Sequence, residues 1–359
     1  MNLPLNTILQ GDCLEMVKTI PDNSIDCCIT SPPYYGLRDY GVDGQIGLEE
    51  TPEEYIDKLT SLFREVRRVL KDDGTLWVNI GDSYAAQRGG TYQPAESLAG
   101  GIGGKTVDGE KVNRGRAEGY NPTRNAAAIG LKHKDLIGIP WMLAFALRSD
   151  GWYLRQDIIW HKPNPMPESV KDRCTKSHEY IFLLSKSPHY YFDYEAIQEE
   201  ATGYDGRKDT MHKGSKKYTQ ECMPGMQKQE MASRAHERWK FKNLQDKGQT
   251  TQTMHERRAE GKQDILYPVR NKRDVWSVPV KPCKEAHFAI YPEELIKPCI
   301  LAGCKVGGIV LDPFFGSGTT GRVAEALGRN YIGCELNPEY VKIAEKRTSD
   351  VQLTIMGFM

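Results

Sequence analysis

The stretch GGIVLDPFFGSGTTGRVAEALGRNYIGCELNPEY, residues 307–340, decides the fold. An apolar run ends at Asp312, a glycine loop follows and opens a helical pattern, and a second apolar run ends at Glu335. Glu335 comes about 20 residues after Gly316, the spacing at which a ribose-binding acid follows a nucleotide-binding loop. A strand, a glycine loop, a helix and a second strand form one unit of a parallel α/β sheet.

The loop glycines predict a cofactor that contains a nucleoside. Gly316, Gly318 and Gly321 fit the pattern G-x-G-x-x-G, which lets a ligand approach the backbone closely. Glu335 is placed to accept hydrogen bonds from two ribose hydroxyls. A dinucleotide such as NAD fits this pattern as well. A nucleoside triphosphatase does not, because no Lys follows the glycines as in a phosphate loop.

The rest of the chain alternates apolar runs with helical patterns. Short apolar runs predict strands at residues 5–10, 24–30, 75–80, 153–160, 180–184, 308–311 and 331–334. Apolar residues at helical spacing predict helices at residues 56–70, 136–147, 292–302, 319–327 and 338–346. Such alternation predicts an α/β fold with a doubly wound, mostly parallel sheet.

A second strand end, ITSPPYYGLRDYG at residues 29–41, carries chemistry of its own. Pro32 and Pro33 offer carbonyl acceptors, lack N–H donors and hold the backbone rigid. If Ser31 Oγ and the Pro32 carbonyl each accept an N–H, an exocyclic nucleobase amine is held with its lone pair aimed at an electrophile. Tyr34 would supply a stacking face for the base. The motif alone is also compatible with an ordinary turn.

Composition limits the remaining possibilities. The 359 residues carry 48 basic and 48 acidic side chains, so overall charge gives no argument for nucleic-acid binding. Residues 201–275, however, hold 17 basic and 10 acidic residues with little aliphatic periodicity, and residues 85–134 are rich in Gly and Arg. Both segments are interpreted as insertions beyond the core, either solvated loops or nucleic-acid contacts.

Cysteine and histidine usage predicts a cytoplasmic protein without a metal. The nine cysteines form no paired C-x-x-C framework, and the sequence shows neither a signal peptide nor a membrane span. His212, His236 and His255 lie too far apart to suggest zinc. Cys283 and Cys299, each after a proline, are interpreted as structural rather than nucleophilic.

Together, two motifs resemble a known family. Residues 29–34, ITSPPY, resemble the catalytic motif of the DNA amino-methyltransferases, and residues 312–320, DPFFGSGTT, resemble their S-adenosylmethionine loop. The catalytic motif precedes the cofactor loop, as in the permuted beta class. The resemblance covers most of residues 5–84, 135–195 and 275–347, and it implies the Rossmann-like fold of class I S-adenosylmethionine-dependent methyltransferases.

The resemblance also implies site residues. The implied catalytic residues are Ser31, Pro32, Pro33 and Tyr34. The implied cofactor-binding residues are Asp12, Asp312, Phe314, Gly316, Ser317, Gly318, Thr319, Thr320 and Glu335, with Asp12 at the site of an acid that contacts the cofactor's adenine. The segment that starts at His287 is expected to border the cofactor.

The resemblance and the composition of the two insertions together divide the chain into five expected segments. They are a catalytic half with the SPPY motif (1–84), a Gly/Arg-rich insertion (85–134), a continuation of the catalytic domain (135–200), a target-recognition region (201–275) and a cofactor-binding half (276–359).

The resulting hypothesis is methyl transfer from S-adenosylmethionine directly to N4 of a flipped-out cytosine in double-stranded DNA. Ser at the first position of the tetrad is associated with cytosine N4 in this family, and N6-adenine methylation is the alternative. Two other classes stay open from the residues alone: a nicotinamide oxidoreductase and a non-catalytic DNA-binding relative. The resemblance further allows a homodimer and a cognate restriction endonuclease that acts independently, with no membrane partner.

Overall fold

The computed structural model describes residues 3–86, 90–91, 120–121, 126–127, 129–200, 269–281 and 291–356. The chain divides into two compact units, Met1–Ile197 with Lys272–Met359 and Gln198–Asn271. In the second unit the described residues form an antiparallel pair, β8 (Glu199–Glu200) and β9 (Val269–Arg270). Arg270 Nε donates to Glu199 Oε1 across this pair at 3.0 Å.

The first unit is built on an eight-stranded sheet. Its strands, in spatial order, are β1 (Thr7–Gln10), β12 (Asn330–Glu335), β11 (Ile309–Asp312), β2 (Ile25–Thr30), β3 (Leu70–Ile80), β7 (His178–Ser185), β6 (Tyr153–His161) and β10 (Val275–Ser277). Neighbours are parallel except at β7, which is antiparallel to both β3 and β6. The predicted mostly parallel sheet is confirmed.

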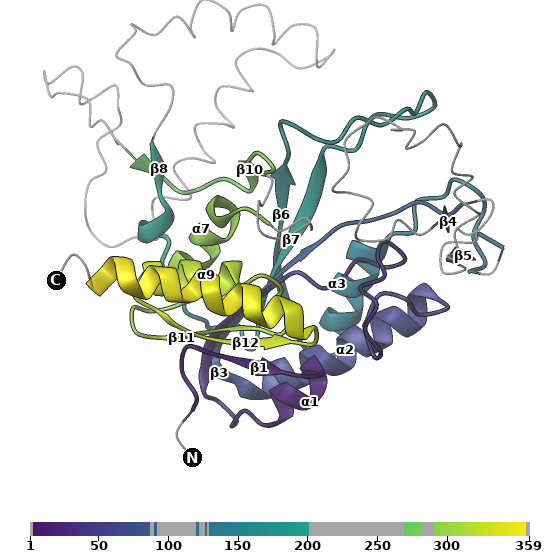
Figure 1. The fold of residues 1–359 in the computed structure, drawn as a ribbon. Helices are drawn as coiled ribbons and strands as arrows, with labels where there is room; N and C mark the ends of the chain where they lie inside the picture. Colours follow the sequence, from purple (N-terminus) through teal and green to yellow (C-terminus); the bar gives the residue numbers. More distant parts are fainter. Residues whose placement is uncertain are drawn as a thin grey trace, which may run out of the picture. The chain divides into compact units, whose positions relative to one another are not determined.

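Helices cover both faces of the sheet (Figure 1). They are α1 (Cys13–Lys18), α2 (Pro52–Val69) and α3 (Ile139–Ser149) in one core cluster, and α7 (Glu293–Gly303), α8 (Thr319–Ala326) and α9 (Pro338–Met356) in the other. Because both faces of the sheet are covered, successive residues in the middle of a central strand such as β2 are apolar. Cys28 packs in the first cluster, whereas Cys27 and Ile29 pack in the second. In the described part of the chain no helix is long and apolar enough to cross a membrane.

Several elements differ from the sequence prediction in extent. Strand β3 begins at Leu70, directly after α2, because Leu70 pairs with Ile25. The last helix, α9, continues to Met356, ten residues beyond the expected end at Lys346. The short elements α1 and β10, a 3₁₀ turn at Glu195–Ile197, and the strand pair β4 (Gly90–Thr91) and β5 (Tyr120–Asn121) are not predicted. They span too few residues to show a period.

The order of the strands brings the two motifs together. Strand β11 pairs with β2, through Val310 with Cys27 and Leu311 with Cys28. The chain leaves β11 through α8 toward β12 and leaves β2 through α2 toward β3, so it departs to opposite sides. Ligands bind where strand connections diverge in this way, at the carboxyl ends of the strands.

Candidate active site

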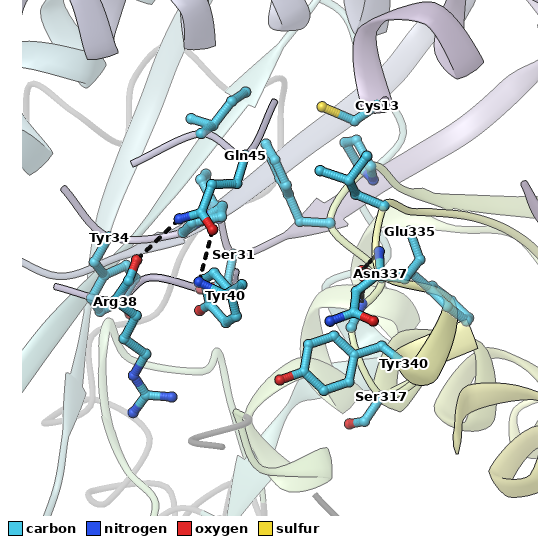
Figure 2. Close-up of a pocket in the computed structure, with 18 of the residues that line it drawn as sticks. Cys13, Ser31, Tyr34, Arg38, Tyr40, Gln45, Ser317, Glu335, Asn337 and Tyr340 are labelled. Carbon is cyan, nitrogen blue, oxygen red and sulfur yellow. Dashed lines mark hydrogen bonds between the residues drawn. The ribbon is translucent and has the colours of Figure 1, made fainter. Parts of the chain in front are cut away.

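A cleft of about 250 Å³ lies at these strand ends. Ten of the predicted site residues line it: Asp12, Ser31, Pro32, Pro33, Tyr34, Phe314, Gly316, Ser317, Thr319 and Glu335. Figure 2 shows Ser31 and Tyr34 on one side of the cleft and Glu335 and Ser317 on the other. Asp312, Gly318 and Thr320 are not among the lining residues.

The glycine loop is shaped by more than its approach to a ligand. Gly316 and Gly318 have φ values of +54° and +81°, a left-handed region that favours glycine. A Cβ on Gly318 would lie 3.0 Å from that of Ala344 in α9, and a Cβ on Gly321 would lie 2.7 Å from the Phe315 ring. Close packing therefore accounts for Gly318 and Gly321, and of the three loop glycines it is Gly316 that lines the cleft.

Glu335 fixes this loop and keeps acceptor capacity. Its carboxylate accepts the N–H of Gly316 and that of Asn337, each at 2.7 Å and each on a different oxygen. Burial raises the pKa of Glu335, and the two backbone donors oppose that rise. Each carboxylate oxygen has a second lone pair, so ribose hydroxyls can still be accepted at the cleft.

Asp312 lies behind the cleft wall and joins four segments. Its carboxylate accepts from Thr30 Oγ1 at 2.6 Å, the Phe314 N–H at 3.0 Å, Thr320 Oγ1 at 2.5 Å and the Tyr291 hydroxyl at 2.9 Å. The residue is fully buried, which raises its pKa, while the four donors favour the ionised form. Asp312 thus ties the end of β2 to the cofactor loop. Tyr291, from the segment expected to border the cofactor, does line the cleft.

The catalytic elbow is held from outside the motif. The Pro33 carbonyl accepts the Tyr55 hydroxyl at 2.7 Å, and Ser31 Oγ donates to Asn79 Oδ1 at 3.3 Å. The Tyr34 hydroxyl donates to Glu179 Oε2 at 2.6 Å. Burial and the Glu179 charge raise the pKa of Tyr34 well above its usual value, so its hydroxyl stays protonated.

The residues after the elbow order a loop along the cleft. Gln45 accepts the Tyr40 N–H at 2.7 Å and donates to the Arg38 carbonyl at 3.2 Å, as Figure 2 shows. Asp39 accepts the N–H of Gly41 at 2.8 Å. Tyr35 is only 1% exposed and packs behind the elbow, with its ring 5.5 Å from that of Tyr55.

Sequence reasoning missed several residues of this site. Asn79 lines the cleft from β3, Lys162 from the position that follows β6, and Glu179 from β7. Arg347 in α9 donates to the carbonyl and hydroxyl of Ser317 at 2.8 and 2.6 Å. Asn79, Lys162 and Glu179 each lie at or beside the end of a predicted strand, but the sequence does not show which of these strand ends meet.

The cysteines and histidines considered in the sequence analysis either lie in a structural environment or fall outside the described ranges. Cys299 is buried, and burial raises its thiol pKa, which fits a structural role. No group of three or more potential metal ligands occurs in the ranges that the structure covers. Cys283 and the three histidines, His212, His236 and His255, lie outside the described residues.

Comparison with known proteins gives the family. A family model described as DNA methylase, of the N6/N4 type, matches residues 25–346. The type II methyltransferase M.Cfr9I of Citrobacter freundii is 44% identical over 341 residues, 95% of this chain and 87% of the relative. M.SmaI of Serratia marcescens is 44% identical over 347 residues, 96% of this chain and 91% of the relative.

Among solved structures, the fold is similar to that of the PvuII cytosine-N4-specific DNA methyltransferase, with a TM-score of 0.56 at 17% identity over 98% of this chain and 92% of that one. It is also similar to that of TTHA0409 from Thermus thermophilus in complex with S-adenosyl-L-methionine, with a TM-score of 0.51 at 22% identity over 96% and 93%. The chain belongs to the N4/N6 family of DNA methyltransferases.

Proposed function

We propose that this DNA methyltransferase methylates N4 of cytosine. The observation that carries the proposal is that one cleft holds both the Ser31–Pro32 acceptors and the loop fixed by Glu335. Ser31 supports cytosine as the target, because Ser at this position of the tetrad is associated with N4 methylation. N6-adenine methylation is the alternative, since the acceptor pair suits either amine.

The methyl donor is S-adenosylmethionine, and the residues present fit it. Glu335 offers acceptors for ribose hydroxyls, and Asp12 places a second carboxylate on the lining. Phe314 and Leu336 give the same lining apolar surface for an adenine ring. When bound, the cofactor supplies a methyl group on a cationic sulfur, which an amine nitrogen takes with its lone pair while the sulfur keeps the bonding electrons and one amine proton is released.

The chain's own residues hold the amine and orient its lone pair. Ser31 Oγ and the Pro32 carbonyl accept one N–H each, and the prolines present no donor that would compete. Tyr34 lies beside them with its hydroxyl fixed on Glu179, so its ring offers a rigid surface for the base. Such positioning is a large part of catalysis when the nucleophile is a weakly basic amine.

The target base must leave the duplex to reach this cleft, at a cost of a few kcal/mol. Contacts with the rest of the DNA have to offset that cost, and residues 201–275, with their basic excess, are proposed as the target-recognition region. Most of that region lies outside the described residues. Family membership removes the oxidoreductase interpretation, and the intact Ser31, Asp312 and Glu335 argue against a non-catalytic relative.

The test is incubation of the purified protein with unmethylated bacterial DNA and labelled S-adenosylmethionine, followed by nucleoside digestion and mass spectrometry. We expect N4-methylcytosine, whereas N6-methyladenine would refute the choice of base. Ser31→Ala should bind S-adenosylhomocysteine normally and transfer methyl at least about 100-fold more slowly. A normal rate in Ser31→Ala would refute the amine-holding role.

A further inference from the structure

Asn79 contacts Ser31 from a strand that the motif does not include. It lies in β3, is 4% exposed, and receives the Ser31 hydroxyl hydrogen bond on its Oδ1 atom at 3.3 Å. An amide oxygen accepts and cannot donate, so this contact requires the Ser31 proton. The direction of the Ser31 hydroxyl therefore depends on which way the Asn79 amide points.

The surroundings of Asn79 fix that direction. Its Nδ2 group donates to the Tyr180 carbonyl at 3.1 Å and lies 3.4 Å from Glu179 Oε2. Both are acceptors, so exchanging the amide oxygen and nitrogen would place three oxygens without a proton between them. The amide oxygen consequently faces Ser31 and Tyr34.

Tyr34 does not compete for this oxygen. Its hydroxyl lies 3.3 Å from Asn79 Oδ1 but only 2.6 Å from Glu179 Oε2, and it has a single proton to donate. The shorter contact is to a carboxylate, which forms the stronger hydrogen bond. Glu179 is held in turn by an ion pair with Lys162. Asn79 Oδ1 is thus left to accept the Ser31 proton.

We infer that Asn79 is a positioning residue that makes Ser31 an obligate acceptor, so that the site selects a base with an exocyclic amine over one with a carbonyl. With its proton committed to Asn79, Ser31 Oγ presents lone pairs to the cleft. An amine N–H satisfies them, whereas the carbonyl of a uracil or thymine would face them as a second acceptor. The inference rests on the proposed methylation of an amine. It adds the residue that makes the Ser31 hydroxyl an acceptor, and not a donor, toward the cleft.

A pair of DNA duplexes directly tests whether Ser31 acts as an acceptor toward the target base. The methylated nucleoside and its position in the DNA are first identified for the wild type by mass spectrometry and sequencing. That step tests the proposed function independently of the inference about Asn79. Duplexes with cytosine or uracil at the target are then compared in binding to wild type and Asn79→Leu. The variant frees the Ser31 hydroxyl to rotate and donate, so the preference for cytosine over uracil should shrink by about 10-fold. An unchanged preference would overturn the inference. If the mapped base is adenine, hypoxanthine replaces uracil in the same comparison.

A double-mutant cycle separates positioning from general stability. Asn79→Leu should slow single-turnover methyl transfer by about 10- to 100-fold, with S-adenosylhomocysteine affinity unchanged. In a Ser31→Ala background the same substitution should have no further effect, because the hydroxyl it orients is gone. An equal loss in both backgrounds would show a merely structural role.

Asn330→Leu is the matched control. Asn330 also donates its amide to a backbone carbonyl, that of Gly307 at 2.9 Å, but it starts strand β12 at the edge away from the cleft. It should leave both the base preference and the transfer rate at wild-type values. If Asn79→Leu does not fold, Asn79→Ala takes its place in both experiments with the same expected directions.

Discussion

Gly81→Ala should disable the catalytic elbow from a position outside both motifs. A Cβ on Gly81 would lie 2.5 Å from Cε2 of the Tyr34 ring. Carbon atoms in contact lie about 3.5 Å apart, so the ring must move by about 1 Å. The Tyr34 hydroxyl is 2.6 Å from Glu179, and Lys162 holds that carboxylate in an ion pair. A shift of this size stretches the Tyr34–Glu179 contact beyond hydrogen-bonding range unless Glu179 and Lys162 move with the ring.

Two effects are expected from this displacement. Misplacing a group in the site by about 1 Å slows methyl transfer by about 100-fold. Overpacking also lowers the free energy of unfolding by about 1–3 kcal/mol. S-adenosylhomocysteine affinity should stay at the wild-type value, because the Gly316–Glu335 hydrogen bond involves none of these atoms. Single-turnover methylation, urea unfolding and titration calorimetry measure the three quantities.

The Tyr34→Ala background supplies the control. Without the ring, Gly81→Ala should no longer destabilise, and it should even add about 0.4–1 kcal/mol because alanine restricts the unfolded chain. The reasoning is refuted if Gly81→Ala alone methylates at the wild-type rate, or if it destabilises equally when the ring is absent.

Two further outcomes are expected. Because burial raises the pKa of Glu335 above its usual 4.5, affinity for S-adenosylhomocysteine should decline as pH falls through that raised value; calorimetry over a pH series should show this decline in wild type, and it should be absent in Glu335→Gln. Thr30→Val removes the 2.6 Å hydrogen bond to buried Asp312 and should lower the free energy of unfolding, measured in urea, by about 1–3 kcal/mol. Thr7→Val is the control: it removes an exposed hydrogen bond to the Leu5 carbonyl and should change the free energy of unfolding very little.

Local sequence was sufficient where one stretch builds its own part of the site. The strand, glycine loop, helix and second strand of residues 307–335 appear in the structure as β11, α8 and β12, with Glu335 at the end of β12 as expected. The elbow at Ser31 likewise follows a strand end. In both cases the informative residues are neighbours in the chain, so their spacing was enough to predict the local order of elements.

Sequence was insufficient where sheet order decides which residues meet. Glu179 and Lys162 reach the elbow because β7 and β6 lie beyond β3 as antiparallel neighbours, and nothing local predicts that pairing. Gly81 looks like an ordinary turn residue until the Tyr34 ring is placed against it. The motif position of Asp312 suggests a cofactor contact, and only its four donors show that it holds the wall of the cleft together.

The hydrogen bond from Thr30 to Asp312 explains why the order of the motifs along the chain matters little. The two residues are 282 positions apart, yet their side-chain oxygens lie 2.6 Å apart because β2 and β11 are neighbours in the sheet. The geometry of the cleft depends on that pairing and on the diverging connections through α2 and α8, and neither depends on which half comes first. A chain that begins with the catalytic half therefore reaches the same arrangement as one that begins with the cofactor half, provided that these two strands pair.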